Sequence, residues 1–352
     1  MKIRVLVQRI IEDQMRARLF KGKAILLFGA RQTGKTTLLK KIVHSYGSDA
    51  LWLNADEYDI KERFNNPTST SMKALIGTKK LVILDEAHQI PGIGIALKLL
   101  VDTYPEIQVV ASGSSAFELQ NKTSEPLTGR KIEFQLFPLS YRELADHNQV
   151  LIEQRLLEHR LVFGSYPEVV NNQGNEVEVL KLLSDSFLYR DLLMLESIKK
   201  PEKLVKLLQA LAYQIGQEVS YNEVGNLIGL DSKTVEAYVR LLEKSFVVFR
   251  LPSFSRNLRN ELKASKKIYF YDNGIRNALI SSFQLFEGRQ DMGALWENYL
   301  VSERRKSNSY GMFYGNAYFW RTKEQQEIDY IEEEEEHTSE LQSRLGTSYA
   351  VF

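Results

Sequence analysis

The chain of 352 residues is long enough for two to four compact units, and 43% apolar with 26% charged residues is typical of a globular protein. Because 46 basic and 45 acidic side chains nearly cancel, no molecule-wide field gathers nucleic acid or a membrane, so any such surface must be local. The absence of cysteine excludes disulfides, thiolate zinc sites and cysteine nucleophiles, and it predicts a cytoplasmic protein.

The first twenty residues combine basic and apolar side chains, as a targeting peptide does. Gln8 and Arg9 interrupt the apolar run, however, and Glu12 and Asp13 follow it, so we interpret the segment as an amphipathic helix. No stretch approaches the roughly 18 to 20 apolar residues that span a bilayer. We therefore expect no membrane contact.

Residues 24–28, AILLF, predict a strand buried on both faces of a parallel sheet. The next residues, GARQTGKT at 29–36, match the phosphate loop G-x-x-x-x-G-K-[ST] between a strand and a helix. Its glycines let the backbone curl around phosphate oxygens, and Lys35 is expected to reach the β and γ phosphates of ATP. The predicted nucleotide-binding residues are Gly29, Ala30, Arg31, Gln32, Thr33, Gly34, Lys35, Thr36, Thr37 and Ser112.

A second apolar run, LVIL at 81–84, ends in Asp85 and Glu86. Carboxylates at the carboxyl end of a parallel strand lie in the crevice where such sheets bind ligands. We predict that Asp85 and the Thr36 hydroxyl hold Mg²⁺ and that Glu86 is the base that orients the attacking water. The alternative for the two acids is a solvated strand end, and His88 is interpreted as a surface residue.

Three further strands are predicted at 107–111, 50–54 and 132–136. Ser112 or Ser114, directly after the first of them, would sense the γ phosphate; the alternative is a serine-rich turn. Arg130 precedes the last strand. It is a candidate arginine finger, acting in cis or across a subunit boundary, against the alternative of an ordinary surface ion pair.

The tetrapeptide at 85–88 spells the acidic motif of DEAH helicases. A helicase of that class needs two recombinase-like lobes, whereas this chain has one phosphate loop and one acidic strand, and residues after 146 look helical. A nucleoside kinase is a second alternative, but it would leave Glu86 and the long downstream domains unexplained. A single ATPase core is the interpretation that fits.

The order of motifs resembles a family of bacterial and archaeal AAA-type ATPases with a winged helix and a C-terminal domain similar to restriction-type nucleases. The resemblance covers nearly the whole chain and implies an architecture and ATP use rather than a biological task. It is carried by GARQTGKTTLL at 29–39, LDEAHQIPG at 84–92, SGSS at 112–115, LTGR at 127–130, FPLSYREL at 137–144, GSYPEVV at 164–170, YRDLL at 189–193, YFYDNGIRNAL at 269–279 and LWENYLVSE at 295–303.

Residues 150–196 predict apolar helices that pack as a lid, interrupted by turn residues at 164–170. Helices are then predicted at 201–216, 221–229 and 232–245, with Ser220 and Asp231 or Ser232 as N-caps, Gly229 as a terminator and a strand at 247–252. This is a winged helix-turn-helix pattern. Its third helix is balanced in charge, which is not typical of a DNA reader, but residues 245–278 hold seven Lys or Arg against two acids with aromatic residues between them. We weigh contact with DNA phosphates through this segment equally with a purely structural or protein-binding winged helix.

The last segment contains Glu297 and Asp329 at the positions of two acids of a restriction-type nuclease site. The third strand with its glutamate and lysine is missing, because the chain continues with five glutamates from 332 to 336. We therefore predict no nuclease activity and poor order beyond about Glu332. A frameshift or early stop within the glutamate run is the alternative to a solvated tail.

The predicted fold class is α/β, with an AAA-type ATPase core at 1–146, a helical lid at 147–198, a winged helix at 199–280 and a truncated nuclease-like domain at 281–352. The predicted function is Mg²⁺-dependent ATP hydrolysis that controls contact with a macromolecule, DNA first and a protein partner as the alternative. In that alternative the chain is a nucleotide-dependent switch that hydrolyses little ATP. The sequence does not fix the oligomeric state.

Overall fold

The computed structural model describes residues 6–113, 127–186, 200–254, 266–313, 315–322 and 326–333. The chain divides into two compact units, and each is described by itself. Unit 1 consists of Met1–Asn148, Tyr166–Asn171 and Lys244–Phe246, and unit 2 of Gln149–Ser165, Asn172–Glu243 and Val247–Phe352. The α/β fold class is confirmed, whereas the four domain boundaries given above stay a prediction.

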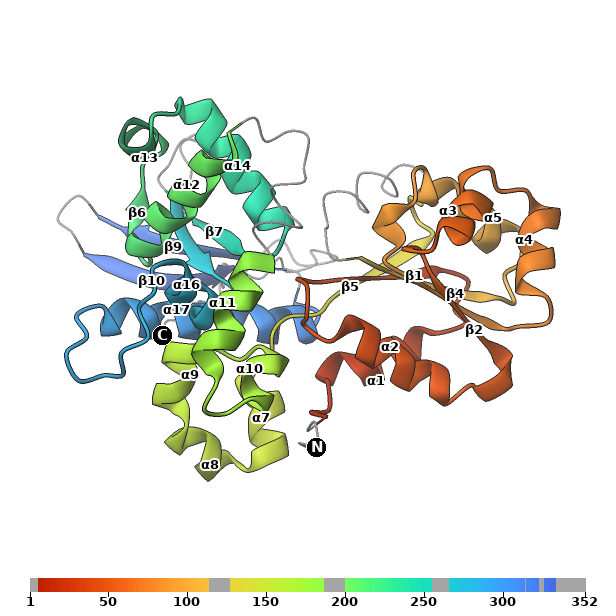
Figure 1. Cartoon of the computed structure of the whole chain (residues 1–352), viewed down its shortest axis with the longest axis horizontal. Coiled ribbons are helices and arrows are strands. Elements are labelled where there is room, and N and C mark those ends of the chain that lie inside the picture. The colour runs from red at the N-terminus through yellow and green to blue at the C-terminus, as the bar shows by residue number, and fades with distance from the viewer. Residues whose placement is uncertain are drawn as a thin grey trace, which may run out of the picture. The chain divides into compact units, whose positions relative to one another are not determined.

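Unit 1 is built on a parallel sheet with the strand order β2, β3, β4, β1, β5 (Figure 1). Strands β1, β3 and β4 are buried along their whole length, as continuous apolar runs require, whereas the edge strands β2 and β5 are partly exposed. The predicted strands are confirmed. Their bounds are β1 Ala24–Phe28, β2 Ala50–Asn54, β3 Leu81–Asp85, β4 Gln108–Gly113 and β5 Lys131–Gln135.

Helices cover both faces of this sheet, with α1 and α2 on one side and α3, α4 and α5 on the other (Figure 1). The amphipathic helix predicted near the start is α1, and it buries Ile11 and Met15. The helices of unit 1 are α1 Ile10–Arg18, α2 Lys35–His44, α3 Tyr58–Asn65, α4 Ser69–Ile76, α5 Ile93–Thr103, α7 Tyr141–Asn148 and α10 Pro167–Asn171. Short 3₁₀ turns occupy Gly47–Asp49 and Ala87–Gln89.

Unit 2 begins with helices α8 (Val150–Arg155) and α9 (Leu157–Phe163), where the sequence suggested one apolar helix. A buried ion pair joins them, because Arg160 donates to both carboxylate oxygens of Glu153 at 3.0 and 2.9 Å. Gly164 ends α9 with φ of 71°, and a Cβ there would lie 2.0 Å from the Asp272 carboxylate. Glycine is therefore required at this turn.

Helix α16 (Asn273–Leu279) is a packing centre of unit 2. Asp272 caps it by accepting from the Ile275 amide at 3.2 Å, and the same carboxylate accepts from the Ser165 amide at 2.8 Å. Asn277 donates to the Val162 carbonyl at 2.7 Å. These buried contacts fix α16 against the end of α9 and the turn that follows it. Helix α11 (Glu176–Ser186) also packs against α16.

Helices α12 (Pro201–Tyr213), α13 (Tyr221–Ile228) and α14 (Ser232–Lys244) agree with the three predicted helices. Ser220 caps α13 and Gly229 ends it in the left-handed region at φ of 71°, as expected. At the start of α14 the cap is Asp231, which accepts from the Thr234 amide at 2.9 Å. An antiparallel sheet of order β6, β8, β7 accompanies these helices, with bounds β6 Glu218–Val219, β7 Val248–Pro252 and β8 Lys266–Phe270.

The last described elements are helix α17 (Met292–Tyr310) and the antiparallel pair β9 (Asn316–Arg321) and β10 (Glu327–Glu333). Poor order was expected beyond about Glu332; Glu333 still belongs to β10, and the residues from 334 on lie outside the described part of the chain. No helix among the described residues is long and apolar enough to cross a membrane.

Candidate nucleotide site

The carboxylate of Asp85 is the centre of a polar cluster at the carboxyl end of β3. The Thr36 hydroxyl donates to its Oδ2 at 2.8 Å, and the Ser112 hydroxyl donates to its Oδ1. Asp85 is only 5% exposed and Ser112 is fully buried. Three predicted residues from three segments are thus brought together at one edge of the sheet, whereas Ser114 lies outside the described residues.

The Lys35 ammonium lies inside the phosphate loop. It donates to the carbonyl oxygens of Gly29 at 2.8 Å and Ala30 at 2.9 Å, and the residue is 5% exposed. These are neutral acceptors for a buried cation, and an anionic phosphate oxygen is a stronger partner for the ammonium. The donor set therefore fits a nucleotide phosphate.

The backbone of the loop depends on positive φ angles at Gly29, Gln32 and Gly34, which are 156°, 57° and 100°. At Gly29 a Cβ would lie 2.2 Å from the Leu136 carbonyl oxygen, so only glycine fits between β1 and the chain that leaves β5. Thr33 is buried and donates to the Ala30 carbonyl at 2.9 Å.

The other predicted loop residues lie nearer to solvent. Arg31 is half-buried, and Gln32 and Thr37 are exposed. Arg31 is close enough for its charge to act on the carboxylate of Glu86.

Glu86 lies beside this cluster in a strained conformation. Its φ of 54° is uncommon for a residue other than glycine, and such strain is concentrated at functional sites. Its amide donates to Asp85 Oδ1 at 3.2 Å and to the Ser112 hydroxyl at 3.3 Å. Burial raises the pKa of Glu86, and the charge of Lys35 counteracts part of that rise. A carboxylate with a raised pKa next to a cation is suited to act as a base.

His88 was interpreted as a surface residue, and that interpretation is wrong. The residue is 5% exposed, and its Nδ1 lies 3.2 Å from Glu86 Oε2. The short 3₁₀ turn at Ala87–Gln89 directs the imidazole back toward the acid that precedes it. A residue three positions after the end of β3 thus contacts the candidate base.

Arg130 is not brought to this cluster. Lys131 pairs with Ala24 at the start of β1, whereas the phosphate loop follows Phe28 at the other end of that strand. Arg130 Nε instead lies 2.5 Å from Asp102 Oδ1 in an exposed ion pair, which is the alternative weighed for it. The predicted role of Arg130 as an arginine finger within its own chain is therefore wrong. Its role across a subunit boundary stays a prediction.

Arg9 is a residue of the site that the sequence reasoning missed. Its guanidinium is buried and donates to the Thr33 carbonyl at 2.6 Å, the Phe137 carbonyl at 2.6 Å and Glu143 Oε1 at 3.0 Å. One side chain thus ties the phosphate loop to the segment after β5 and to α7. The available signal was a charged residue inside an otherwise apolar run, which we treated only as an argument against a targeting peptide.

We expect Arg9→Ala to destabilise unit 1 by about 3 kcal/mol, because it leaves the Glu143 carboxylate buried without its cation. It should also weaken ATP binding, since Thr33 loses its anchor. Arg16→Ala is the matched control: its ion pair with Glu12 is partly exposed and is worth about 1 kcal/mol or less. Thermal unfolding and equilibrium ATP titration measure both effects. Equal losses in the two variants would contradict this role of Arg9.

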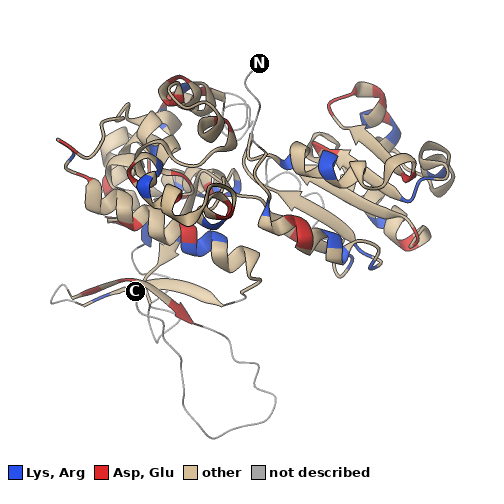
Figure 2. Cartoon of the chain, turned by 90° about the horizontal axis from the view of Figure 1, so that it is seen from below, with Lys and Arg blue, Asp and Glu red and all other residues tan. Residues whose placement is uncertain are grey.

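The basic segment 245–278 differs from its sequence interpretation. Arg250 pairs with Glu243, Lys267 with three carboxylates and Arg276 with Asp291. Tyr269 and Tyr271 are buried, so they offer no exposed face to a nucleic-acid base. Acidic and basic residues are interspersed on the described elements (Figure 2). Of the other four basic residues of the segment, Lys266 is described, whereas Arg256, Arg259 and Lys263 lie outside the described residues.

The C-terminal acids also require a correction. We expected Glu297 and Asp329 to lack a lysine, but Lys267 of β8 donates to Glu297 Oε1 at 3.0 Å and to Asp329 Oδ1 at 2.9 Å. The cation comes from the sheet of β6 to β8 and not from a following strand. The absence of nuclease activity stays a prediction. Of its two stated reasons, the missing third-strand glutamate and the missing lysine, the second is wrong, because Lys267 supplies a cation.

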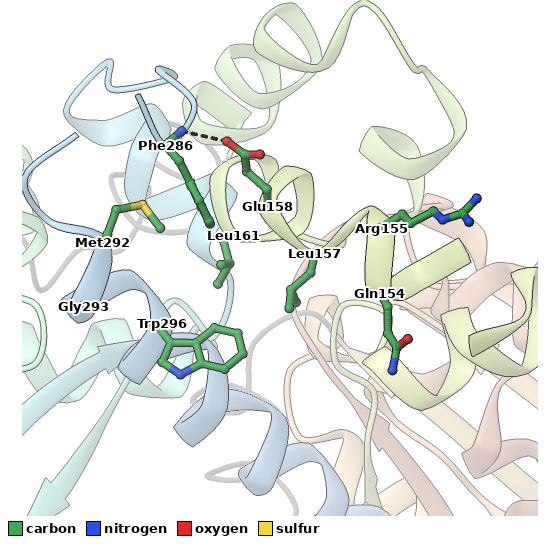
Figure 3. Close-up of a pocket in the computed structure, with 9 residues that line it drawn as sticks. All are labelled: Gln154, Arg155, Leu157, Glu158, Leu161, Phe286, Met292, Gly293 and Trp296. Atoms are coloured by element: carbon green, nitrogen blue, oxygen red, sulfur yellow. Dashed lines mark hydrogen bonds between the residues drawn. The ribbon is translucent and has the colours of Figure 1, made fainter. Parts of the chain in front are cut away.

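A separate hollow of about 560 Å³ lies within unit 2 between α9 and α17 (Figure 3). Leu157, Leu161, Met292 and Trp296 give it an apolar lining, and the Phe286 amide donates to Glu158 at 2.8 Å at its rim. None of the lining residues belongs to the phosphate loop. Its charged lining residues are Arg155 and Glu158, and the predicted nucleotide-binding residues are all elsewhere, in unit 1.

Three family models match successive parts of the chain. Residues 21–145 match an AAA domain, residues 154–285 a domain of unknown function (DUF8612) and residues 292–349 another domain of unknown function (DUF4143). The first match spans the phosphate loop, Asp85, Glu86 and Ser112.

Relatives of similar architecture occur in bacteria and archaea. An uncharacterised protein of Mycobacterium tuberculosis is 26% identical over 325 residues, which are 91% of this chain and 70% of the relative. One from Methanocaldococcus jannaschii is 20% identical over 344 residues, 92% of this chain and 75% of the relative. Among solved structures, the ADP form of the Aeropyrum pernix ORC2 protein is similar with a TM-score of 0.39 and 13% identity, covering 85% of this chain and 95% of that one. A TM-score this low supports no inference about function.

Proposed function

We propose that this chain, an AAA-type ATPase by its residues 21–145, hydrolyses ATP with Mg²⁺ and uses the nucleotide state to control its contact with a macromolecule. The observation that carries the proposal is the cluster at the carboxyl ends of β3 and β4, beside the phosphate loop. There a buried cation, a hydroxyl–carboxylate pair and a second carboxylate with a raised pKa lie on neighbouring segments. ATP hydrolysis needs these groups at this spacing.

The roles follow from the chemistry of each group. Lys35 exchanges the carbonyls of Gly29 and Ala30 for β and γ phosphate oxygens. Thr36 and Asp85 are hard oxygen ligands that suit Mg²⁺, which usually keeps several of its waters. Glu86 accepts the proton of the attacking water as it adds to the γ phosphorus, and the bond to the β–γ bridging oxygen breaks.

Ser112 is proposed to report the presence of the γ phosphate. Its hydroxyl is shared between Asp85 and the Glu86 amide in this structure, so a change at the metal would reach the backbone of the candidate base directly. Arg130 is proposed to complete the site only in an assembly, where it would leave Asp102 and face the nucleotide of a neighbouring copy.

The proposed macromolecular partner is duplex DNA, contacted through α14 and the basic segment 245–278. The support is the arrangement of α12 to α14 with three antiparallel strands, together with Lys266 and the basic residues Arg256, Arg259 and Lys263. Three other basic residues of the segment already have acidic partners. The DNA footprint is therefore expected to be small.

Duplex DNA is expected to raise the ATPase rate, and this stimulation should fade between about 50 and 200 mM salt because phosphate contacts release counterions. Steady-state phosphate release with and without DNA at the two salt concentrations measures it. A variant with Arg256, Arg259 and Lys263 changed to alanine should lose the stimulation but keep the basal rate. Stimulation that persists in this variant would place the DNA contact elsewhere.

The second candidate is a nucleotide-dependent switch acting on a protein partner, with little turnover. The observation that supports this candidate is that Arg250, Lys267 and Arg276 of the basic segment already pair with acids. DNA that neither binds nor stimulates, together with a basal rate that stays slow, would select this second candidate.

A further inference from the structure

The ammonium of Lys267 lies among three carboxylates. Its Nζ is 3.0 Å from Glu297 Oε1, 2.6 Å from Glu327 Oε1 and 2.9 Å from Asp329 Oδ1. The lysine side chain is 2% exposed, while the three acids are 22%, 28% and 53% exposed. The cation is therefore inside the cluster and the acids separate it from water.

Three elements build this cluster. Lys267 is on β8, the middle strand of the sheet β6, β8, β7, and Glu297 is on α17. The other two acids are two residues apart on β10 and so share one face of it. Tyr269 shares a face of β8 with Lys267, and its hydroxyl donates to Glu297 Oε1 at 2.6 Å.

The contacts use the whole capacity of the lysine. An ammonium has three N–H donors, and three carboxylates lie at hydrogen-bonding distance. Burial by itself lowers the pKa of Lys267, but the hydrogen bonds to Asp329 and Glu327 and the charge of Glu297 outweigh burial and raise it. The Phe319 ring covers the ammonium, with its centroid 5.5 Å from Nζ. The lysine stays charged and in place.

Three carboxylates around one point are also the oxygen set that a hard divalent cation prefers. A metal ion and the ammonium would compete for the same oxygens, and Lys267 already pairs with all three carboxylates. With the ammonium between them, Glu297, Glu327 and Asp329 are not arranged to hold a metal, and neither is any other group of three acidic or histidine side chains among the described residues.

We propose that Lys267 is the resident cation of this cluster: its ammonium occupies the position that a divalent ion would take between Glu297, Glu327 and Asp329. It ties α17 and β10 to β8 and keeps metal out. The three carboxylates face the ammonium and not a metal ion, and removal of the ammonium alone should free them to bind one.

The test uses the full chain without nucleotide and Mn²⁺ as the probe, with free Mn²⁺ measured by electron paramagnetic resonance. Lys267→Met keeps the length of the stem and removes the charge, so it should bind one more Mn²⁺ per chain than the wild type. Asp329→Asn in the Lys267→Met background should abolish that extra site. Lys266→Met, at the neighbouring residue of β8, is the matched control and should bind as the wild type does.

The second part of the test measures Mn²⁺ binding by the protein that keeps Lys267. Its Mn²⁺ binding should not change on Asp329→Asn alone, because Lys267 already holds that carboxylate. Wild-type binding that is lost in Asp329→Asn, or a folded Lys267→Met protein with no extra site, would overturn the proposal. A Lys267→Met protein that folds only when Mn²⁺ is present would support it, and if that variant never folds, the wild-type arm decides.

Discussion

Lys35→Ala is expected to raise the dissociation constant for ATP by about 100-fold or more. The substitution removes charged hydrogen bonds to phosphate, each worth about 1.5 to 3 kcal/mol, and two such bonds correspond to at least two orders of magnitude. In the structure Lys35 is already inside the loop, where it donates to the Gly29 and Ala30 carbonyls. Equilibrium titration with a fluorescent ATP analogue measures the effect.

The matched control for this prediction is Lys41→Ala. Lys41 is on the same helix, α2, but its partly exposed ammonium pairs with Glu12 at 2.7 Å, away from the loop. This variant should bind ATP as the wild type does, and circular dichroism should confirm that both variants fold. An affinity unchanged by Lys35→Ala would contradict the nucleotide site itself.

Glu86→Gln is expected to bind ATP normally but to hydrolyse it about 10²-fold more slowly or worse, because an amide cannot accept the proton of water. Glu57→Gln, an exposed acid before α3, is the control and should leave the rate unchanged. Single-turnover phosphate release separates binding from chemistry. Normal turnover by Glu86→Gln would remove this residue from the mechanism.

The same residue sets an expected pH dependence. Burial raises the pKa of Glu86, so the ionised form that acts as a base is lost at a higher pH than for an ordinary glutamate. The turnover number should therefore fall on the acid side through this raised pKa and reach a plateau above it. A rate that is flat down to the ordinary range of a glutamate would contradict the role of base.

The sheet of unit 1 could be predicted from the sequence because its strands are continuous apolar runs. Residues 24–28 and 50–54 were expected as strands and are β1 and β2. Local capping chemistry was equally readable, since Ser220 and Gly229 act within a few residues of their own positions. Information of this kind is carried by neighbours in the chain.

Contacts between distant segments could not be predicted in this way. Arg9 meets Glu143 across 134 positions, and Lys267 meets Asp329 across 62. Strand β8 was not recognised because its sequence KKIYF starts with two lysines, one of which is buried among acids from α17 and β10 and under the Phe319 ring. No local pattern marks such a lysine as buried.

The prediction that Arg130 acts on the phosphates of its own chain is an error of a different kind, because the sequence was sufficient to exclude it. A residue just before a strand of a parallel sheet lies at the amino ends of the strands, whereas the phosphate loop lies at the carboxyl ends. Its candidate role as an arginine finger was inferred from its place just before a predicted strand. The direction of the strands therefore excludes contact between Arg130 and the phosphates within one chain.

The measurement that tests the central claim most directly is a crystal structure of the full chain with Mg²⁺ and a non-hydrolysable ATP analogue. We predict that the phosphates lie in the loop at 29–36, with Lys35 Nζ turned from the Gly29 and Ala30 carbonyls to the β and γ phosphates. Mg²⁺ should lie beside the Thr36 hydroxyl and Asp85, with Glu86 facing the γ phosphate. An analogue bound elsewhere, with Lys35 still on both carbonyls, would contradict the account.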